Sequence, residues 1–174
     1  MAKVDVDFRD VFPQTIDGLD GDGLLLVSQG ADGKPNVMTI GWAAIGTIWR
    51  RQIFLALVRQ SRHTHQLLEQ NGDFTVNLMP ADWGDAVAFC GDVSGREHDK
   101  FAEKGLKAVP AAKVRAPVIE QALVQYECRT VQKTDMNPAN TDPAVVSRFY
   151  ANGNFHTLYF GEIVAVRAEE GSGK

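Results

Sequence analysis

The feature that most constrains the fold is a series of β-prone runs separated by links too short for parallel pairing. Residues 24–29 read LLLVSQ, and a turn-rich GADGKP segment separates them from a long apolar stretch over residues 36–49. A further run covers residues 52–58, and we expect Arg50 and Arg51 to mark the turn before it. Because parallel neighbours need crossovers of about a dozen residues or more, these runs predict antiparallel strands in a meander or barrel.

Helical patterns interrupt the β runs in the middle of the chain. We expect a short helix over residues 61–70, with Ser61 as its N-cap and Asn71-Gly72 at its end. Further short helices are predicted over residues 81–90 and 96–104, and strands over residues 74–79, 122–133 and 157–167.

These elements predict a mainly β protein with inserted helices. The expected architecture is a closed antiparallel sheet, a split β-barrel with Greek-key-like connections. With 174 residues the chain suits one domain, which we place at residues 23–168. Residues 1–22 are interpreted as an irregular lead-in and residues 169–174 as a flexible tail.

Composition and charge exclude several kinds of partner. The formal net charge of −4 gives no overall positive field that would attract nucleic acid or an anionic membrane. The first twenty residues lack the pattern of a secretory signal, and no apolar segment is long enough to cross a bilayer. Cys90 and Cys128 have no metal-ligand spacing, so we expect free thiols and a cytoplasmic location.

The junction at residues 61–64 (SRHT) is the first candidate binding element. The start of a helix exposes unpaired N–H groups and the positive end of its dipole, both of which attract phosphate. Ser61 and Thr64 add hydroxyl donors, and Arg62 adds a planar cation that can hold phosphate oxygens at two points. The alternative is that Ser61 only caps the helix.

The segment at residues 36–42 (NVMTIGW) is the second candidate. Asn36, Thr39 and Gly41 lie in a strand that otherwise reads as buried, and a glycine lets another group approach the backbone closely. A flat heterocycle could take hydrogen bonds from the main chain and from Thr39, with Trp42 as an apolar wall. The alternative is a bulged strand with Trp42 in the core.

The segment at residues 94–101 (SGREHDKF) is the third candidate, because Lys100 could offer a cation to a phosphate or to an anionic ring. The alternative is a solvated helix face with Phe101 packed inward. Elsewhere the four histidines form no metal set, and nucleophile-elbow, phosphate-loop and dinucleotide signatures are absent from the sequence. Chemistry supplied by a cofactor fits such a chain.

In this order the three segments resemble the flavin reductase-like family, which includes the flavoredoxins. The likeness extends over residues 23–167 and includes the late TLYFGEIVAV run. It implies an FMN-binding split barrel that forms a homodimer, with the ring near residues 36–42, the phosphate near residues 61–64, and Lys100 close by. His156 is implied more weakly, from the opposite subunit. The implied FMN-binding residues are Asn36, Met38, Thr39, Ile40, Gly41, Trp42, Ser61, Arg62, His63, Thr64, Lys100 and His156.

The resemblance also implies an activity. NADH or NADPH would reduce FMN, and electrons would pass on to a free flavin, to iron, to oxygen or to a protein. An FMN-binding electron carrier that a partner protein reduces is the alternative, and a split barrel holding haem or no ligand is a third. No catalytic side chain and no metal site is assigned.

Overall fold

The structure is a computed structural model that describes residues 3–170, in which the chain forms an eight-stranded, wholly antiparallel sheet. The strand order is β3-β2-β6-β9-β10-β5-β4, and β1 pairs with β10. The strands are β1 (Lys3–Asp5), β2 (Leu24–Gln29), β3 (Pro35–Ile40), β4 (Ala43–Ile48), β5 (Arg51–Arg59), β6 (Asp73–Leu78), β9 (Val124–Asp135) and β10 (His156–Glu169). The predicted mainly β, antiparallel class is confirmed.

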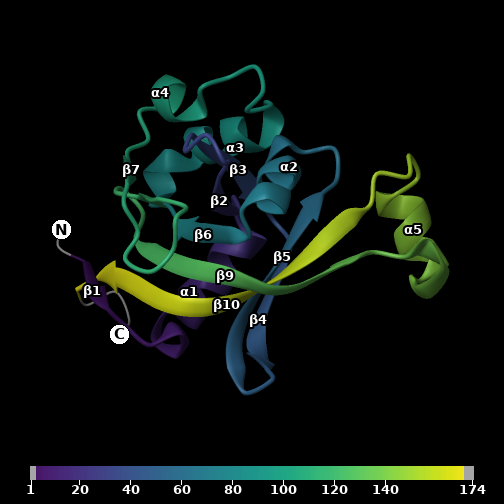
Figure 1. The fold of residues 1–174 in the computed structure, drawn as a ribbon, viewed down its shortest axis with the longest axis horizontal. Helices are drawn as coiled ribbons and strands as arrows, with labels where there is room; N and C mark the ends of the chain where they lie inside the picture. The colour runs from purple at the N-terminus through teal and green to yellow at the C-terminus, as the bar shows by residue number, and fades with distance from the viewer. Residues whose placement is uncertain (1–2, 171–174) are drawn as a thin grey trace.

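Helices occupy the connections between strands. They are α1 (Phe8–Asp20), α2 (His63–Gln70), α3 (Gly84–Asp92), α4 (Lys100–Lys104) and α5 (Pro143–Phe149), with the 3₁₀ turns η1 (Ala81–Trp83) and η2 (Pro138–Asn140). Figure 1 shows α2, α3 and α4 gathered on one side of the sheet, whereas α5 stands apart at the far end of β9 and β10. Between residues 3 and 170, no helix has the length and hydropathy needed to span a bilayer.

The two edges of the sheet are joined by a very short link. Strand β3 lies at one edge and β4 at the other, yet only Gly41 and Trp42 separate them in the chain. The Cα atoms of Ile40 and Ala43, three positions apart, can lie at most about 11 Å from each other. The sheet must therefore roll until its edges approach, which gives the split barrel and places the link at the seam.

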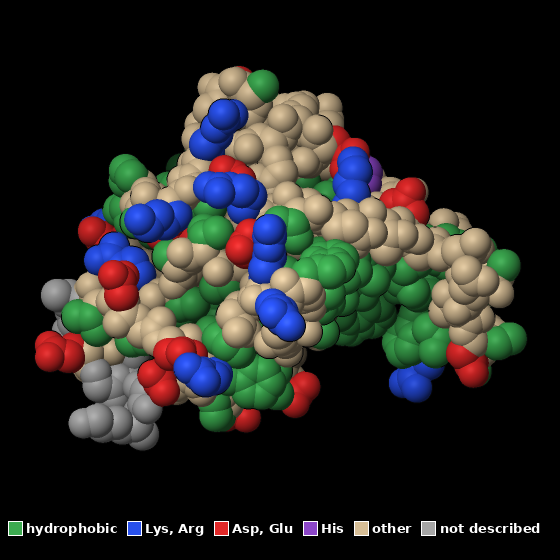
Figure 2. Space-filling model, turned by 60° about the horizontal axis from the view of Figure 1, so that its bottom comes forward, with side chains coloured by type: hydrophobic (Ala, Val, Ile, Leu, Met, Phe, Trp, Pro, Cys, Tyr) green, Lys and Arg blue, Asp and Glu red, His purple; other side chains and the backbone are tan. Residues whose placement is uncertain are grey.

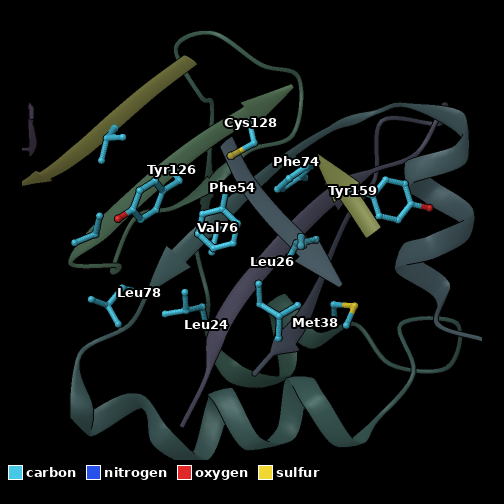
Figure 3. Close-up of a cluster of buried hydrophobic side chains, with 14 of the residues drawn as sticks. Leu24, Leu26, Met38, Phe54, Phe74, Val76, Leu78, Tyr126, Cys128 and Tyr159 are labelled. Carbon is cyan, nitrogen blue, oxygen red and sulfur yellow. The ribbon is translucent and has the colours of Figure 1, made fainter. Parts of the chain in front are cut away.

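The barrel interior is filled by the inward-facing residues of the strands. Phe54 and Tyr126 are fully buried with their rings edge-on at 5.5 Å, and Phe74 lies beside them (Figure 3). The opposite face of β6 is buried as well, under the segment that contains β7 (Ala108–Val109) and β8 (Val118–Ile119). There the Thr75 hydroxyl donates to the Pro117 carbonyl, so this polar residue keeps a partner.

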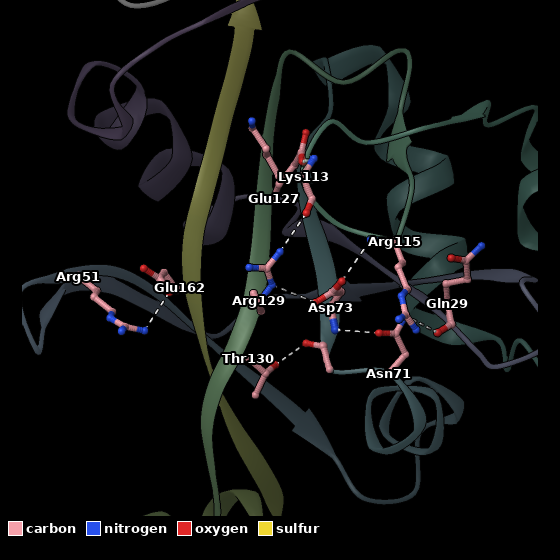
Figure 4. Close-up of polar contacts among 11 residues, drawn as sticks. Gln29, Arg51, Asn71, Asp73, Lys113, Arg115, Glu127, Arg129, Thr130 and Glu162 are labelled. Atoms are coloured by element: carbon pink, nitrogen blue, oxygen red, sulfur yellow. Dashed lines mark hydrogen bonds and ion pairs between the residues drawn. The ribbon is translucent and has the colours of Figure 1, made fainter.

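A buried carboxylate holds the loop that leads to β8. Glu127 on β9 is 1% exposed and accepts hydrogen bonds from the backbone N–H groups of Ala112 and Lys113 at 2.9 and 2.6 Å. Nearby, Arg129 donates to the Lys113 carbonyl and Asp73 accepts from the Arg115 N–H (Figure 4). Charge-assisted contacts of this kind replace regular secondary structure in fixing the loop.

The predicted irregular lead-in is wrong, because both β1 and α1 lie within it. Asp7 caps α1 by accepting from the Arg9 N–H, and Val11 is fully buried. The Thr15 hydroxyl lies 2.7 Å from the Tyr126 hydroxyl in the core. Pro13 and Gly18 obscured the helical periodicity, although α1 accommodates both.

Several boundaries also differ from the prediction. The stretch 36–49 is divided at Gly41-Trp42 into β3 and β4, and the hairpin turn falls at Trp49 and Arg50, whose φ angles of 53° and 59° fit a two-residue turn. Strand β10 continues through Glu169, and residues 171–174 of the expected tail lie outside the described residues. In addition, α3 continues to Asp92, α4 begins only at Lys100, and β9 runs to Asp135. The short strands β7 and β8, between α4 and β9, were not predicted.

We expect Gly161→Ala to destabilise the fold by about 1–3 kcal/mol through overpacking. A Cβ at this position of β10 would lie 2.4 Å from Phe74 Cζ and 2.9 Å from Cys128 Cβ, both in the core. The matched control is Gly46→Ala in β4, where a Cβ meets nothing within 4 Å. Denaturant unfolding measures both variants, and equal midpoints would contradict the expected overpacking.

Candidate functional site

Two adjoining cavities lie at the seam of the barrel. The first, which we call the link cavity, has a volume of about 160 Å³. It is lined by Met38, Thr39, Ile40, Gly41, Trp42, Leu57, Arg59, Arg62 and His156. At Gly41 the backbone is bare, and a Cβ there would meet no protein atom within 4 Å, so a flat group can lie against the main chain.

The second cavity, which we call the cationic cavity, has a volume of about 320 Å³. It is lined by Asn36, Met38, Arg59, Ser61, Arg62, His63, Thr64, Asp92, Val93, Ser94, Gly95, Arg96, Lys100 and Asn154. This lining contains three arginines and a lysine but only one carboxylate, that of Asp92, so the cavity attracts anions. Because Met38, Arg59 and Arg62 line both cavities, one ligand can occupy the two together.

Helix α2 begins at the wall of the cationic cavity. Arg62 is its N-cap and makes no side-chain capping hydrogen bond, so the first-turn N–H groups are not used up by a cap. Thr64 in the first turn is buried and accepts from Asn36 Nδ2 at 2.8 Å. In the described part of the chain, the buried Nδ1 of His63 has no hydrogen-bond partner.

Ser61 is not the N-cap that the sequence predicted. The cap position falls one residue later, and the Ser61 hydroxyl accepts instead from Asn154 Nδ2 at 2.8 Å. Its own proton is therefore free to be donated. Asn154 lies in the segment between α5 and β10, so this contact brings a distant part of the chain to the cavity.

The three arginines of the site fix the segments around it. Arg62 donates to the Gly91 carbonyl at 2.7 Å, and Arg96 donates to the Ser61 carbonyl at 3.1 Å. Arg59 donates to the carbonyls of Asn154 at 2.6 Å and Phe149 at 3.2 Å. Because a guanidinium has five N–H donors, each arginine keeps donors for a ligand.

Lys100 is buried beneath the cavity instead of lying on a solvated helix face. It is 4% exposed, and its ammonium donates to the carbonyls of Val37 at 2.9 Å and Cys90 at 2.8 Å. Burial lowers the pKa of Lys100 to about 8. Lys100 therefore ties β3 to α3, and its third N–H is left for another acceptor.

The apolar side of the link cavity is aromatic. Trp42 is 40% exposed and so is not the core residue of the alternative interpretation. Its ring lies 5.1 Å from Phe149 and 5.3 Å from His156, and the Arg59 guanidinium lies 5.9 Å from it. The Thr39 hydroxyl donates to the Val87 carbonyl, so it can only accept from a ligand.

His156 lines the link cavity of its own chain, whereas the sequence resemblance implied a contribution from the opposite subunit. Burial, and then the charges of Arg59 and Arg62, lower the pKa of His156 to about 4. The imidazole is therefore neutral at pH 7. Its Nδ1 lies 2.7 Å from the Tyr150 hydroxyl.

All twelve residues implied by the sequence resemblance line one or both cavities. Sequence reasoning missed Arg59, Arg96 and Asn154. A charged residue at the end of the apolar strand β5, two positions before the SRHT segment, was a usable signal for Arg59. Arg96 stood within a quoted segment but was not selected, and nothing in the sequence indicates that Asn154 reaches the site.

Other features of the molecule lack this concentration of cations. A hollow of about 900 Å³ adjoins the cationic cavity beyond Asn36, but its lysines and arginine are balanced by Asp32, Glu97 and Asp99. Residues 3–170 contain no group of three His, Cys, Asp or Glu side chains placed to hold a metal. Both cysteines are buried free thiols, and burial raises the pKa of Cys90 to about 11, which keeps it protonated.

Fold and site together define a mainly β split-barrel protein with cavities suited to a planar, anionic ligand. A family model described as "Flavin reductase like domain" matches residues 21–174. The chain belongs to the flavin reductase-like family.

Solved structures share this fold. A flavoredoxin of Desulfovibrio vulgaris (Miyazaki F) has a TM-score of 0.68 and 24% identity, covering 84% of this chain and 69% of that one. A putative flavin reductase with a split barrel domain from Shewanella frigidimarina has a TM-score of 0.70 and 18% identity, covering 90% and 72%. An FMN-binding protein from Thermus thermophilus has a TM-score of 0.67 and 24% identity, covering 85% and 70%.

A curated relative is an uncharacterized protein of Archaeoglobus fulgidus, 29% identical over 133 residues. The match covers 76% of this chain, which spans 65% of the length of that relative.

Proposed function

We propose that the chain binds FMN, with the ring in the link cavity and the phosphate in the cationic cavity. The observation that supports this proposal is that Met38, Arg59 and Arg62 line both cavities. The link cavity offers the bare backbone of Gly41, and the cationic cavity offers four cations. The donor set fits the group: arginine forks, the Ser61 hydroxyl and the start of α2 are all suited to phosphate. The FMN-binding protein of Thermus thermophilus, named above, supports this ligand by its fold.

We further propose an oxidoreductase that takes electrons from NADH or NADPH. Bound FMN would supply the two-electron chemistry. The chain's own residues would bind and orient it: Arg62 and Ser61 at the phosphate, Gly41 and Trp42 against the ring. Arg59, at the shared wall, would place a fixed positive charge beside the ring, which favours a reduced, anionic form.

Absorption spectra and rapid mixing test this proposal in two steps. Titration of the purified chain with FMN should give saturable binding, with one FMN per chain. Rapid mixing with NADH should then bleach the bound flavin on a catalytic timescale. Absence of FMN binding, or a haem spectrum in the purified protein, would refute the ligand assignment.

The second candidate is an electron carrier that a partner protein reduces. The exposure of Trp42 at the link cavity favours it, because an open edge of the bound ring would let a protein partner approach. The flavoredoxin neighbour gives support from the fold. FMN that binds but is not bleached by NADH or NADPH would favour the carrier over the reductase.

We also propose that the chain acts as a homodimer in the cytoplasm. The buried free thiols of Cys90 and Cys128 support a reducing compartment. Hydrophobic side chains gather on the face between the protruding α5 region and the rest of the molecule (Figure 2). Large apolar residues remain exposed on this chain, among them Trp42, Trp49, Val131, Val145 and Phe149.

Analytical sedimentation of the purified chain tests the proposed dimer by measuring its mass in solution. We expect about twice the chain mass of 19.1 kDa. Trp49→Glu introduces a charge at the most exposed of these residues and should shift the population towards monomer. A wild-type chain that sediments as a monomer at all concentrations would contradict the proposal.

A further inference from the structure

A buried hydrogen bond between two side chains lies behind the link cavity. The Tyr150 hydroxyl and His156 Nδ1 are 2.7 Å apart, and the two residues are 3% and 7% exposed. Tyr150 is the C-cap of α5, and His156 is the first residue of β10. Stacking of the Tyr150 ring on Phe155, with centroids 4.8 Å apart, holds the phenol in place.

The direction of this hydrogen bond follows from the acceptors that surround Tyr150. Its single proton can go to His156 Nδ1 or to Met136 Sδ, which lies 3.1 Å away. A thioether is a weak acceptor, whereas a neutral imidazole nitrogen is a strong one. The stronger acceptor favours donation to Nδ1, and when the hydroxyl donates there the imidazole carries its own proton on Nε2.

The neutral state of the imidazole supports this assignment. The charged groups that face His156 are the guanidinium groups of Arg59 and Arg62, and the Tyr150 phenol is the neighbouring titratable group. Two cations beside a buried imidazole disfavour a second proton on it. His156 thus keeps one proton. The hydrogen-bond partner of Nδ1 decides which ring nitrogen carries this proton.

The other ring nitrogen is free to meet a ligand. In the described part of the chain, His156 Nε2 makes no hydrogen bond to protein, and His156 lines the link cavity together with Trp42 and Met38. We propose that Tyr150 is a positioning residue that fixes His156 as its Nε2–H tautomer, so that His156 donates a hydrogen bond to an acceptor atom of the bound ring. This proposal rests on the proposed binding of FMN, whose ring edge presents carbonyl oxygens and unprotonated nitrogens.

The first experiment reads the tautomer in the ligand-free protein. In ¹⁵N-labelled wild-type chain at pH 7, the His156 ring should show a protonated Nε2 and an unprotonated Nδ1, with His156→Gln used to assign the signals. Tyr150→Phe should give a mixture of both tautomers. Tyr126→Phe is the matched control, because it removes a buried hydroxyl that bonds to Thr15 and should leave the His156 signals unchanged.

The second experiment is a double-mutant cycle on FMN affinity. Tyr150→Phe should weaken FMN binding roughly 3- to 10-fold, the range for one neutral hydrogen bond. In the His156→Gln background, the same change should have no further effect, because glutamine has no tautomer to fix. If the losses of FMN affinity caused by Tyr150→Phe and His156→Gln multiply in the double variant, the positioning role of Tyr150 is overturned.

The two experiments distinguish a failure of the tautomer proposal from a failure of the proposed FMN binding. A protonated Nδ1 in wild type, or an unchanged Nε2–H tautomer in Tyr150→Phe, overturns the proposal whether or not FMN binds. A wild-type chain that does not bind FMN overturns the proposed function and the donor role of His156 with it. Tautomer signals as expected together with a non-additive cycle support both parts.

Discussion

Replacing Arg62 with alanine is expected to weaken FMN binding roughly 10- to 150-fold, which corresponds to about 1.5–3 kcal/mol for charge-assisted hydrogen bonds. Arg62 lines both cavities and stands at the start of α2, so its remaining N–H donors can reach a phosphate there. Arg62→Lys keeps the charge but lacks the planar fork, and it should recover only part of the affinity. Isothermal titration or flavin fluorescence quenching measures the change.

Two controls separate binding from folding. Arg115→Ala removes the same charge beside a different cavity, so FMN affinity should stay at the wild-type value. Because Arg62 also donates to the Gly91 carbonyl, thermal unfolding of the ligand-free variant must be recorded alongside. Wild-type FMN affinity in Arg62→Ala would refute the phosphate assignment.

Phe54→Ala is expected to cost about 3–5 kcal/mol of unfolding free energy, through lost burial and the cavity left behind. Phe54 is fully buried in β5, with its ring against Tyr126, in the cluster shown in Figure 3. Its strand pairs with both β4 and β10, so the surrounding backbone has little freedom to collapse.

For a chain of this length the loss corresponds to a fall in Tm of about 6–20 °C, measured by calorimetry or circular dichroism. Phe54→Leu retains most of the apolar volume and should cost less than Phe54→Ala. A loss below about 1 kcal/mol for the alanine variant would mean that the core repacks freely, contrary to the close packing described.

The fold was predictable where local patterns carried it. The alternating apolar runs and short turns predicted the antiparallel sheet, since both signals act between neighbours in sequence. The break at Gly41-Trp42 was not foreseen, because apolar residues continue through it and only closure of the barrel requires the change of direction. Helix α1 was missed because its one proline and one glycine weaken the helical signal, whereas its stability comes from contacts with β9 and other distant strands.

The candidate site was predictable in its short motifs and not in its long-range contacts. Residues 36–42 and 61–64 lie within single segments whose polar and glycine residues depart from a buried pattern. Asn154 reaches Ser61 across 93 positions of sequence, and no local rule encodes such a contact. Lys100 is similar: a helix-face pattern indicates solvent, but the carbonyls of Val37 and Cys90 offset the cost of burial.

The placement of α5 has a consequence for design. Within α5 no residue is buried, yet the segment that follows it carries Asn154 and His156 to the cavities, where Arg59 anchors the backbone at Phe149 and Asn154. Changes to the outer turns of α5 should therefore alter the entrance that an incoming molecule meets while leaving the folded framework untouched. Libraries that vary residues 143–147 offer a route to new partner specificity at little loss of stability.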